Sequence, residues 1–226
     1  MQTAETSDNH LVEFFDQDLL DPTDWSRTTV AALSALRERL EAERPAQPTT
    51  AWDDLTVNDL TVLRGDVQLS GELRLDGHLL VLGDLTADVV TGYPAHKILV
   101  VAGDLRCRVL DLCRSYLLVT GAVTASACVR VGCYGLSICA GGITTDLWLD
   151  EMYWNNHDLD DNPVDNIRTS HGFSSEDFPT DVEAGDALQA VVSNQVFLRH
   201  EEGGADVDHL VEQAKLGRQL LRPAHT

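Results

Sequence analysis

The sequence predicts a mainly β protein, a short β-solenoid of about five coils of 18–20 residues each, with flanking α-helical caps. Three observations lead to this prediction. Glycines recur at nearly constant intervals, apolar residues recur at fixed positions around them, and apolar and polar residues alternate with a period of two. That period is typical of a strand, and strands this short bury their apolar side only when successive copies stack.

Five glycines define the repeat, with spacings of 18, 20, 18 and 20 residues: Gly65, Gly83, Gly103, Gly121 and Gly141. The aligned segments are VLRGDV, LVLGDL, VVAGDL, LVTGAV and ICAGGI. Every copy is apolar at the positions three and two residues before the glycine and two residues after it. The position three residues after it is polar in all five copies: Gln68, Thr86, Arg106, Thr124 and Thr144. An antiparallel sandwich, with strands at similar intervals, is the alternative architecture.

The sequence divides into three parts: 1–50, an N-terminal helical cap and linker; 51–150, the solenoid repeats; and 151–226, an acidic loop and a partly helical C-terminal cap. Apolar residues recur at helical spacing at Val30, Leu33, Leu36 and Leu40, and again at Val207, Leu210, Val211 and Ala214. The segment 190–200 fits either a strand or the edge of a helix. Caps at both ends of a solenoid oppose polymerisation, so we expect a monomer or dimer.

The composition is strongly acidic. The chain of 226 residues has 37 acidic and 16 basic residues, a formal charge of −21. Such a charge repels nucleic acid and anionic lipid and favours a basic protein partner. The sequence contains no apolar run long enough for a membrane span, and its first residues do not resemble a signal peptide. Its five cysteines lie in apolar segments and predict buried, reduced thiols in a cytoplasmic protein.

No nucleophile, phosphate-loop or zinc pattern accompanies these features, so we predict no enzymatic activity, cofactor or metal. The segment NNHDLDDNPVDN, residues 155–166, concentrates acidic residues. It lacks the glycine and the terminal glutamate of a calcium loop, and a solvated acidic loop is the favoured interpretation. A metal-dependent enzyme that uses the acidic residues of 146–165 is the less favoured alternative.

A column of ring-bearing residues lies thirteen positions after the five glycines: His78, His96, Tyr116, Tyr134 and Trp154. Stacking for packing alone would explain it. Aromatic side chains beside acidic ones are also typical of protein-binding hot spots. We therefore predict a partner-binding surface in which aromatic anchors are surrounded by a rim of acids: Tyr116, Tyr134, Trp154, Asp158, Asp160 and Asp161.

The repeats LVLGDL and VVAGDL resemble the coils of bactofilin-like, "polymer-forming" bacterial solenoid proteins, over residues 57–145. The C-terminal VDHLVEQAKLGRQLLR is similar to the tail of a related, non-polymerising group, whose members are often found beside secreted toxins as apparent immunity proteins. The resemblance implies a non-catalytic immunity protein. The charge of −21 favours a basic toxin, one directed at nucleic acid, as its partner, and we expect the protein to occlude the active site of that toxin. The alternative is a bactofilin-like scaffold. The small number of coils and the long acidic flanks depart from bactofilins and argue against filaments.

Overall fold

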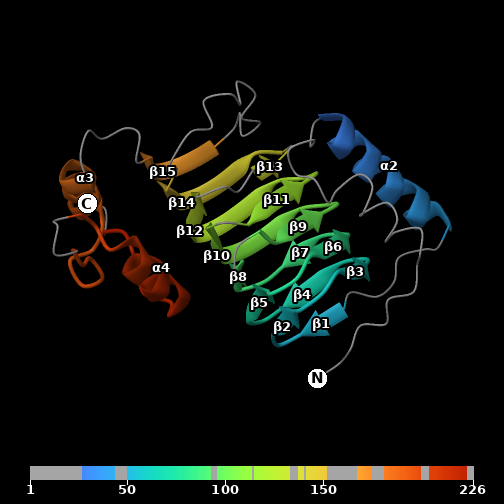
Figure 1. Ribbon diagram of the computed structural model, residues 1–226, viewed down its shortest axis with the longest axis horizontal. Coiled ribbons are helices and arrows are strands. Elements are labelled where there is room, and N and C mark those ends of the chain that lie inside the picture. The colour runs from blue at the N-terminus through green and yellow to red at the C-terminus, as the bar shows by residue number, and fades with distance from the viewer. Residues whose placement is uncertain are drawn as a thin grey trace.

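The computed structural model of the protein describes residues 27–43, 50–92, 96–113, 115–132, 137–139, 141–151, 167–174, 181–199 and 204–222. These residues form a mainly β structure, a solenoid of about four turns with helices beside it (Figure 1). The predicted fold class is confirmed.

The strands form two sheets (Figure 1). The larger sheet contains β1 (Thr50–Trp52), β2 (Leu55–Val57), β4 (Val67–Leu69), β5 (Glu72–Leu75), β7 (Leu85–Thr86), β8 (Val89–Thr91), β10 (Leu105–Cys113), β12 (Val123–Gly132), β14 (Ile143–Glu151) and β15 (Ile167–Ser174). The smaller sheet contains β3 (Thr61–Arg64), β6 (Leu79–Leu82), β9 (Ile98–Val101), β11 (Tyr116–Val119) and β13 (Ser137–Cys139). The named strands all pair in parallel, one coil above the next, which excludes the antiparallel sandwich.

The register of the sheets is the one that the glycine alignment predicts. Leu105 pairs with Leu85 on one side and with Val123 on the other. In the smaller sheet Val101 lies between Val81 and Val119. Each predicted apolar column is therefore a physical column in the solenoid, because its members occupy the same position in successive coils.

The interior of the coils forms one continuous apolar cluster. Val101 and Leu105 are completely buried in it, together with Leu85, Val119 and Val123. Their polar neighbour Arg106 points outward and its side chain is half exposed. This alternation is what a strand with one face in the core requires, and it confirms the predicted orientation of the repeat.

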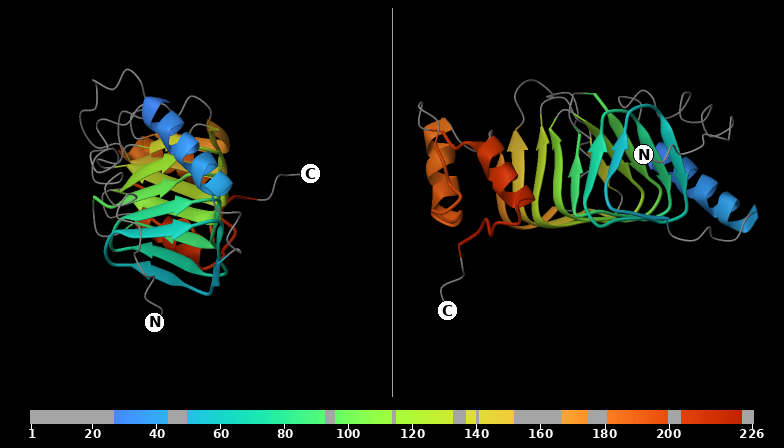
Figure 2. Two further views of the ribbon diagram at one scale, coloured as in Figure 1. Left: turned by 90° about the vertical axis from the view of Figure 1, so that its right-hand side faces the viewer. Right: turned by 90° about the horizontal axis from the view of Figure 1, so that it is seen from below.

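Helices cover the outer faces of the two sheets. The helix α2 (Arg27–Glu43) lies across the smaller sheet, where Leu33 and Leu36 are buried (Figure 2). The helices α3 (Asp181–Val191) and α4 (Val207–Lys215) lie on the opposite side of the solenoid, against the larger sheet (Figures 1 and 2). The described helices thus flank the sides of the stack, with none beside β1 and β2 at its N-terminal end in Figure 1.

Of the segment 190–200, the structure describes residues 190–199: Ala190 and Val191 are the end of α3, as one of the two alternatives predicts, and the rest contains no strand. After α3 ends at Val191, the chain turns near Asn194, and Val192 forms a single antiparallel bridge with Leu221. This bridge connects the end of α3 to the chain that follows α4. The two helices and their connections therefore form one C-terminal unit, residues 181–199 and 204–222.

The C-terminal unit lies where the outer face of the larger sheet is apolar. One outward column contains Val89, Val109, Cys128 and Leu147 in successive coils, and all four are buried under the unit. One coil earlier the same column holds the exposed Glu72. The change from valine to glutamate marks where the covered face ends.

Candidate functional site

Only one residue of the predicted binding surface lies in the described part of the chain. Tyr116 begins β11, and its half-buried ring packs against the apolar cluster beneath α2. Its ring centroid is 6.3 Å from that of His96. Tyr116 therefore contributes to packing, with a part of its ring still exposed.

The predicted aromatic column is wrong at His96. Tyr116 pairs in the sheet with Ile98, two residues beyond His96. The reason is the length of the coils: the two extra residues of the 20-residue coil come between β8 and β9, so counting forward from Gly83 stops two positions short. The rings of His96 and Tyr116 are therefore close in space, but the two residues do not occupy the same position in successive coils.

The other predicted anchors and acids lie outside the described residues: Tyr134, Trp154, Asp158, Asp160 and Asp161. The surface they were predicted to form with Tyr116 stays a prediction.

A ladder of aspartates explains the Gly-Asp motif. Asp66 accepts a hydrogen bond from the backbone N–H of Asp84 at 2.9 Å, and Asp84 accepts one from the N–H of Asp104 at 3.1 Å. Asp104 in turn accepts from the N–H of Ala122 at 2.9 Å. The ladder stops there, because an alanine follows Gly121 and has no side-chain acceptor.

The glycines of the motif are required by the close approach of stacked turns. A Cβ atom on Gly83 would lie 2.3 Å from the carbonyl oxygen of Gly65. One on Gly121 would lie 2.2 Å from a carboxylate oxygen of Asp104. The Gly-Asp pair therefore serves the stacking of coils, with the carboxylates left along one corner of the solenoid.

Two arginines partly neutralise this corner. Arg106 contacts both Asp84, at 3.2 Å, and Asp104, while Arg37 of α2 lies 3.5 Å from Asp84. Although burial opposes it, the hydrogen bonds from the Asp104 N–H and Arg106 hold the pKa of Asp84 below its usual range. Asp66, one coil earlier, is exposed.

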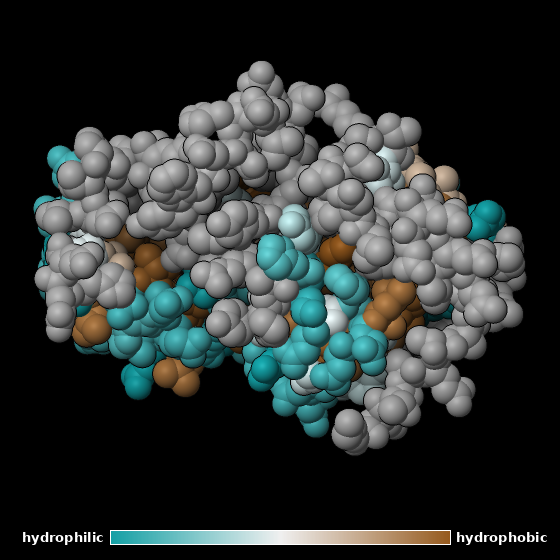
Figure 3. All heavy atoms as spheres, in the orientation of Figure 1, coloured by the Kyte–Doolittle hydropathy of each residue, from teal (hydrophilic) through white to brown (hydrophobic). Residues whose placement is uncertain are grey.

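The first coils contain most of the acidic residues of the described solenoid. Residues 50–92 contain eight acidic and two basic residues. Hydrophilic side chains gather over the lower part of the molecule, where β1, β2, β4 and β5 lie (Figure 3). Here Asp53, Asp54 and Asp59 are exposed in the turns of the first coil.

A buried ionic network joins the solenoid to α4. Asp111 on β10 accepts from Arg130 Nε at 2.7 Å and from Lys215 Nζ at 2.8 Å, and Arg130 also contacts Asp208 of α4. The side chain of Asp111 is only 8% exposed. Burial raises the pKa of a carboxyl group, but the bonds from Arg130 and Lys215 outweigh it and keep the pKa of Asp111 below its usual range.

A second arginine binds the C-terminal end of α4. Arg108 forms two bonds to Asp88, at 2.8 and 2.7 Å, and donates to the carbonyl oxygens of Ala214 and Lys215. The Ala214 carbonyl also accepts from the N–H of Gly217 at 2.9 Å, so Arg108 adds a charged donor at the negative end of the helix dipole. We call the two groups together the α4 latch: Asp88, Arg108, Asp111, Arg130, Asp208 and Lys215.

The latch was not predicted from the sequence. The available signal was a set of charged residues inside apolar strands, Arg108, Asp111 and Arg130. Charges at such positions need buried partners, since an unpaired buried charge is costly. Sequence alone did not identify the partners, because Lys215 and Asp208 lie about 80–110 residues away.

Two cysteines behave as predicted. Cys107 and Cys128 are buried and free, and burial raises the pKa of each thiol to about 12. Thiols with such a pKa are poor nucleophiles and poor metal ligands at neutral pH. Of Cys113, Cys133 and Cys139, the structure describes no side chain.

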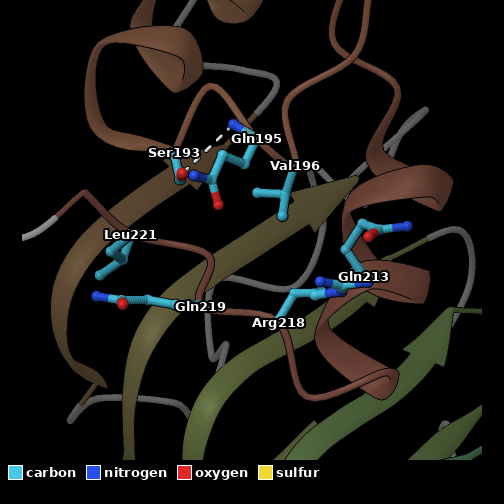
Figure 4. A pocket seen from close by; sticks show the side chains of 7 residues that line it. All are labelled: Ser193, Gln195, Val196, Gln213, Arg218, Gln219 and Leu221. Atoms are coloured by element: carbon cyan, nitrogen blue, oxygen red, sulfur yellow. Dashed lines mark hydrogen bonds between the residues drawn. The ribbon is translucent and has the colours of Figure 1, made fainter.

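A pocket of about 350 Å³ lies in the C-terminal unit (Figure 4). Its lining is Ser193, Gln195, Val196, Gln213, Arg218, Gln219 and Leu221. These residues offer hydrogen-bonding groups and one guanidinium, but no carboxylate, thiol or imidazole to move a proton or bind a metal. Within the described ranges, no three His, Cys, Asp or Glu side chains cluster as metal ligands do.

Comparison with protein-family models, curated proteins and solved structures finds no match to this chain. Among the helices that the structure describes, none has the length and apolar character needed to cross a membrane.

Proposed function

We propose that this protein is a non-catalytic binding protein for a basic protein partner. The more specific form of the proposal is an immunity protein that occludes the active site of a basic, nucleic-acid-directed toxin. Enzymes that act on nucleic acid carry positive clefts, and a protein of charge −21 would be steered toward such a cleft.

The observation that carries the proposal is the placement of acidic residues on coils that share one continuous buried core. Asp53, Asp54, Asp59 and Asp66 are exposed at the turns of the first coils, while the residues inside those coils form one apolar cluster. Because these coils do not need to be ordered on binding, little conformational entropy is lost, and the affinity gains accordingly. A charged surface held in this way favours fast association.

A scaffold function is the second candidate, and one observation favours it. Among the described residues, β1, β2 and β3 each pair with a strand on one side only. An open strand edge can accept another copy of the same chain and so build a longer stack.

The test is to isolate the partner and measure what binding does to it. Purified protein would be immobilised, incubated with a lysate of its own source at physiological salt, and the captured protein identified and produced separately. We expect a basic protein that binds at one-to-one stoichiometry, more weakly as salt rises, and loses its enzymatic activity on binding. A captured protein that is acidic, or that stays active in the complex, would contradict the proposal. Long ordered filaments of the purified chain in electron micrographs would favour the scaffold.

A further inference from the structure

We propose that the N-terminal end of the solenoid, residues 50–59, is the docking site for an extended basic segment of the partner, which adds as a strand to the edge of β1 and β2. This inference rests on the proposed function, since it names where the basic partner binds. It concerns a different surface from the predicted one around Tyr116, Tyr134 and Trp154.

The first support is the direction of the backbone bonds. The carbonyl oxygens of Trp52 and Asp53 accept from Ser70 N at 3.1 Å and from Gly71 N at 2.7 Å, both in the next coil. In the described part of the chain β1 pairs only with β4, and β2 only with β5. A strand in a parallel sheet can form backbone hydrogen bonds along both of its edges. The edges of β1 and β2 that face away from β4 and β5 therefore carry backbone groups that can pair with one more strand.

The second support is an apolar anchor at that edge. Trp52 and Leu55 pack against the end of the interior cluster and are only partly buried, while the next residues inward in the stack, Leu69 and Leu73, are fully buried. A tryptophan with one face on a core and one face exposed is a common anchor in protein interfaces. An added strand would cover this exposed part.

The third support is charge, which selects the occupant. Asp53 accepts a bond from Ser70 Oγ and Asp54 one from Glu72 N, so each uses one carboxylate oxygen within the protein and has a second oxygen for a partner. Asp59 is exposed in the following turn. Lysine or arginine side chains of an added strand would meet these three acids along its length.

The chain's own segments are poor occupants of this edge. Residues 1–26 contain seven acidic residues and no lysine or arginine, and so would be repelled by the three aspartates. Residues 44–49 include Pro45 and Pro48, which lack the N–H that strand pairing needs. A second copy stacked head to tail would bring β15, the last strand of the larger sheet, against this end. Residues 167–174 carry a single arginine, Arg168, so they match the three aspartates less well than a segment with several lysines or arginines would.

The experiment uses the full chain and a nine-residue peptide of alternating lysine and valine, with binding measured by calorimetry. Two variants are compared that remove the same charge, Asp53→Asn/Asp59→Asn at the proposed site and Glu38→Gln/Asp146→Asn at exposed positions elsewhere. We expect the first variant to weaken peptide binding by roughly tenfold and the second by less than about twofold. Equal weakening by the two would overturn the site, because binding would then follow net charge alone.

A second peptide tests strand addition. The same sequence with alternate backbone amides N-methylated keeps its charges but cannot pair along an edge through those groups. We expect its affinity to fall at least about tenfold if the edge is used. Unchanged affinity would overturn strand addition.

The captured partner separates this inference from the proposed function. If a basic partner binds the Asp53→Asn/Asp59→Asn variant with the same affinity as the unchanged protein, residues 50–59 are not its docking site, and the proposed function still stands. Failure to find any basic partner would overturn the proposed function, while the peptide experiments would still decide whether the edge accepts a basic strand.

Discussion

The two sides of the solenoid are covered by helices in different ways. On the smaller sheet, α2 contributes Leu33 and Leu36 to an apolar contact, and Arg37 contacts Asp84 and the carbonyl oxygen of Ala102 at the partly exposed corner. On the larger sheet, α4 also buries apolar residues, but charged side chains of the strands bind it as well: the buried Asp111 and Arg130 and the partly exposed Arg108. Both interfaces combine apolar area with an ion pair, but the pair at α2 is partly exposed to water whereas Asp111 and its pair with Arg130 at α4 are buried.

This difference has a physical consequence. An apolar contact is non-directional, so a helix can shift on it with small loss. A buried carboxylate with two cationic partners permits few positions, because any shift leaves a charge unpaired in a poorly solvated place. We therefore expect the C-terminal unit to be restricted to one position more strictly than α2.

The largest expected effect comes from removing the centre of the latch. Asp111→Ala leaves Arg130 and Lys215 without their buried partner. We expect a loss of about 3–5 kcal/mol in the free energy that holds the C-terminal unit on the larger sheet, or in that of global unfolding if the two are lost together. Denaturant unfolding gives the free energy, and mass-spectrometric thiol labelling should show Cys128, under the C-terminal unit, reacting before the interior Cys107. The matched control is Asp186→Ala, which removes an ion pair with Arg199 at a site where Asp186 is mostly exposed. Equal effects of the two variants would mean that burial of the latch does not matter.

A smaller and more local effect is expected on the other side. Leu33→Ala removes a fully buried side chain of α2 and should cost about 2–3 kcal/mol, the lower part of the range for leucine in a core. Because Leu33 lies outside the interior cluster, the loss should appear as faster hydrogen exchange in α2, with the strands β6 and β9 unchanged. Faster exchange throughout the strands would show that α2 supports the whole stack.

Acid should distinguish the two sides without mutation. The folded state holds the pKa of Asp111 below its unfolded value of about 3.9. The latch therefore contributes stability above that value, and the contribution is lost as the pH falls through the lower, folded-state pKa. Hydrogen exchange, corrected for its intrinsic dependence on pH, should show α4 loosening below about pH 4 before α2 does. The pKa of Asp84 at the α2 side is also lowered, but this side chain is a third exposed, so water screens its contribution to stability. Loosening of α2 before α4 would therefore contradict the conclusion that buried charge stabilises the α4 side more.

The smallest effect is predicted at the exposed corner. Arg106→Ala removes contacts with Asp84 and Asp104, but its side chain is half exposed and screened by water. Thermal unfolding should show a change below about 0.5 kcal/mol. A loss as large as that of Asp111→Ala would mean that the aspartate ladder depends on Arg106 for its integrity.

The sequence by itself determined the solenoid and its register. Alternation with a period of two assigns each residue to the inside or the outside, and the glycine spacing aligns the coils, so Val101, Leu105 and Arg106 could be placed correctly. The same counting failed for His96 and Tyr116, because the register of each strand follows from its own pairing and not from a distance to the previous glycine.

Only the tertiary structure decided how the helices and charges are used. Apolar spacing predicted helices in the flanks but not the sheet faces they cover, since any apolar stripe fits any apolar face. The partners of Asp111 are Arg130, on the next coil, and Lys215, near the C-terminal end of the sequence. No pattern within a short stretch of sequence relates these three residues. Likewise, the position of Trp52 at the end of the core, beside strands that pair on one side only among the described strands, follows from where the stack begins in space. Local pattern determines which side of a strand faces the core, whereas the meeting of distant segments depends on packing the whole chain.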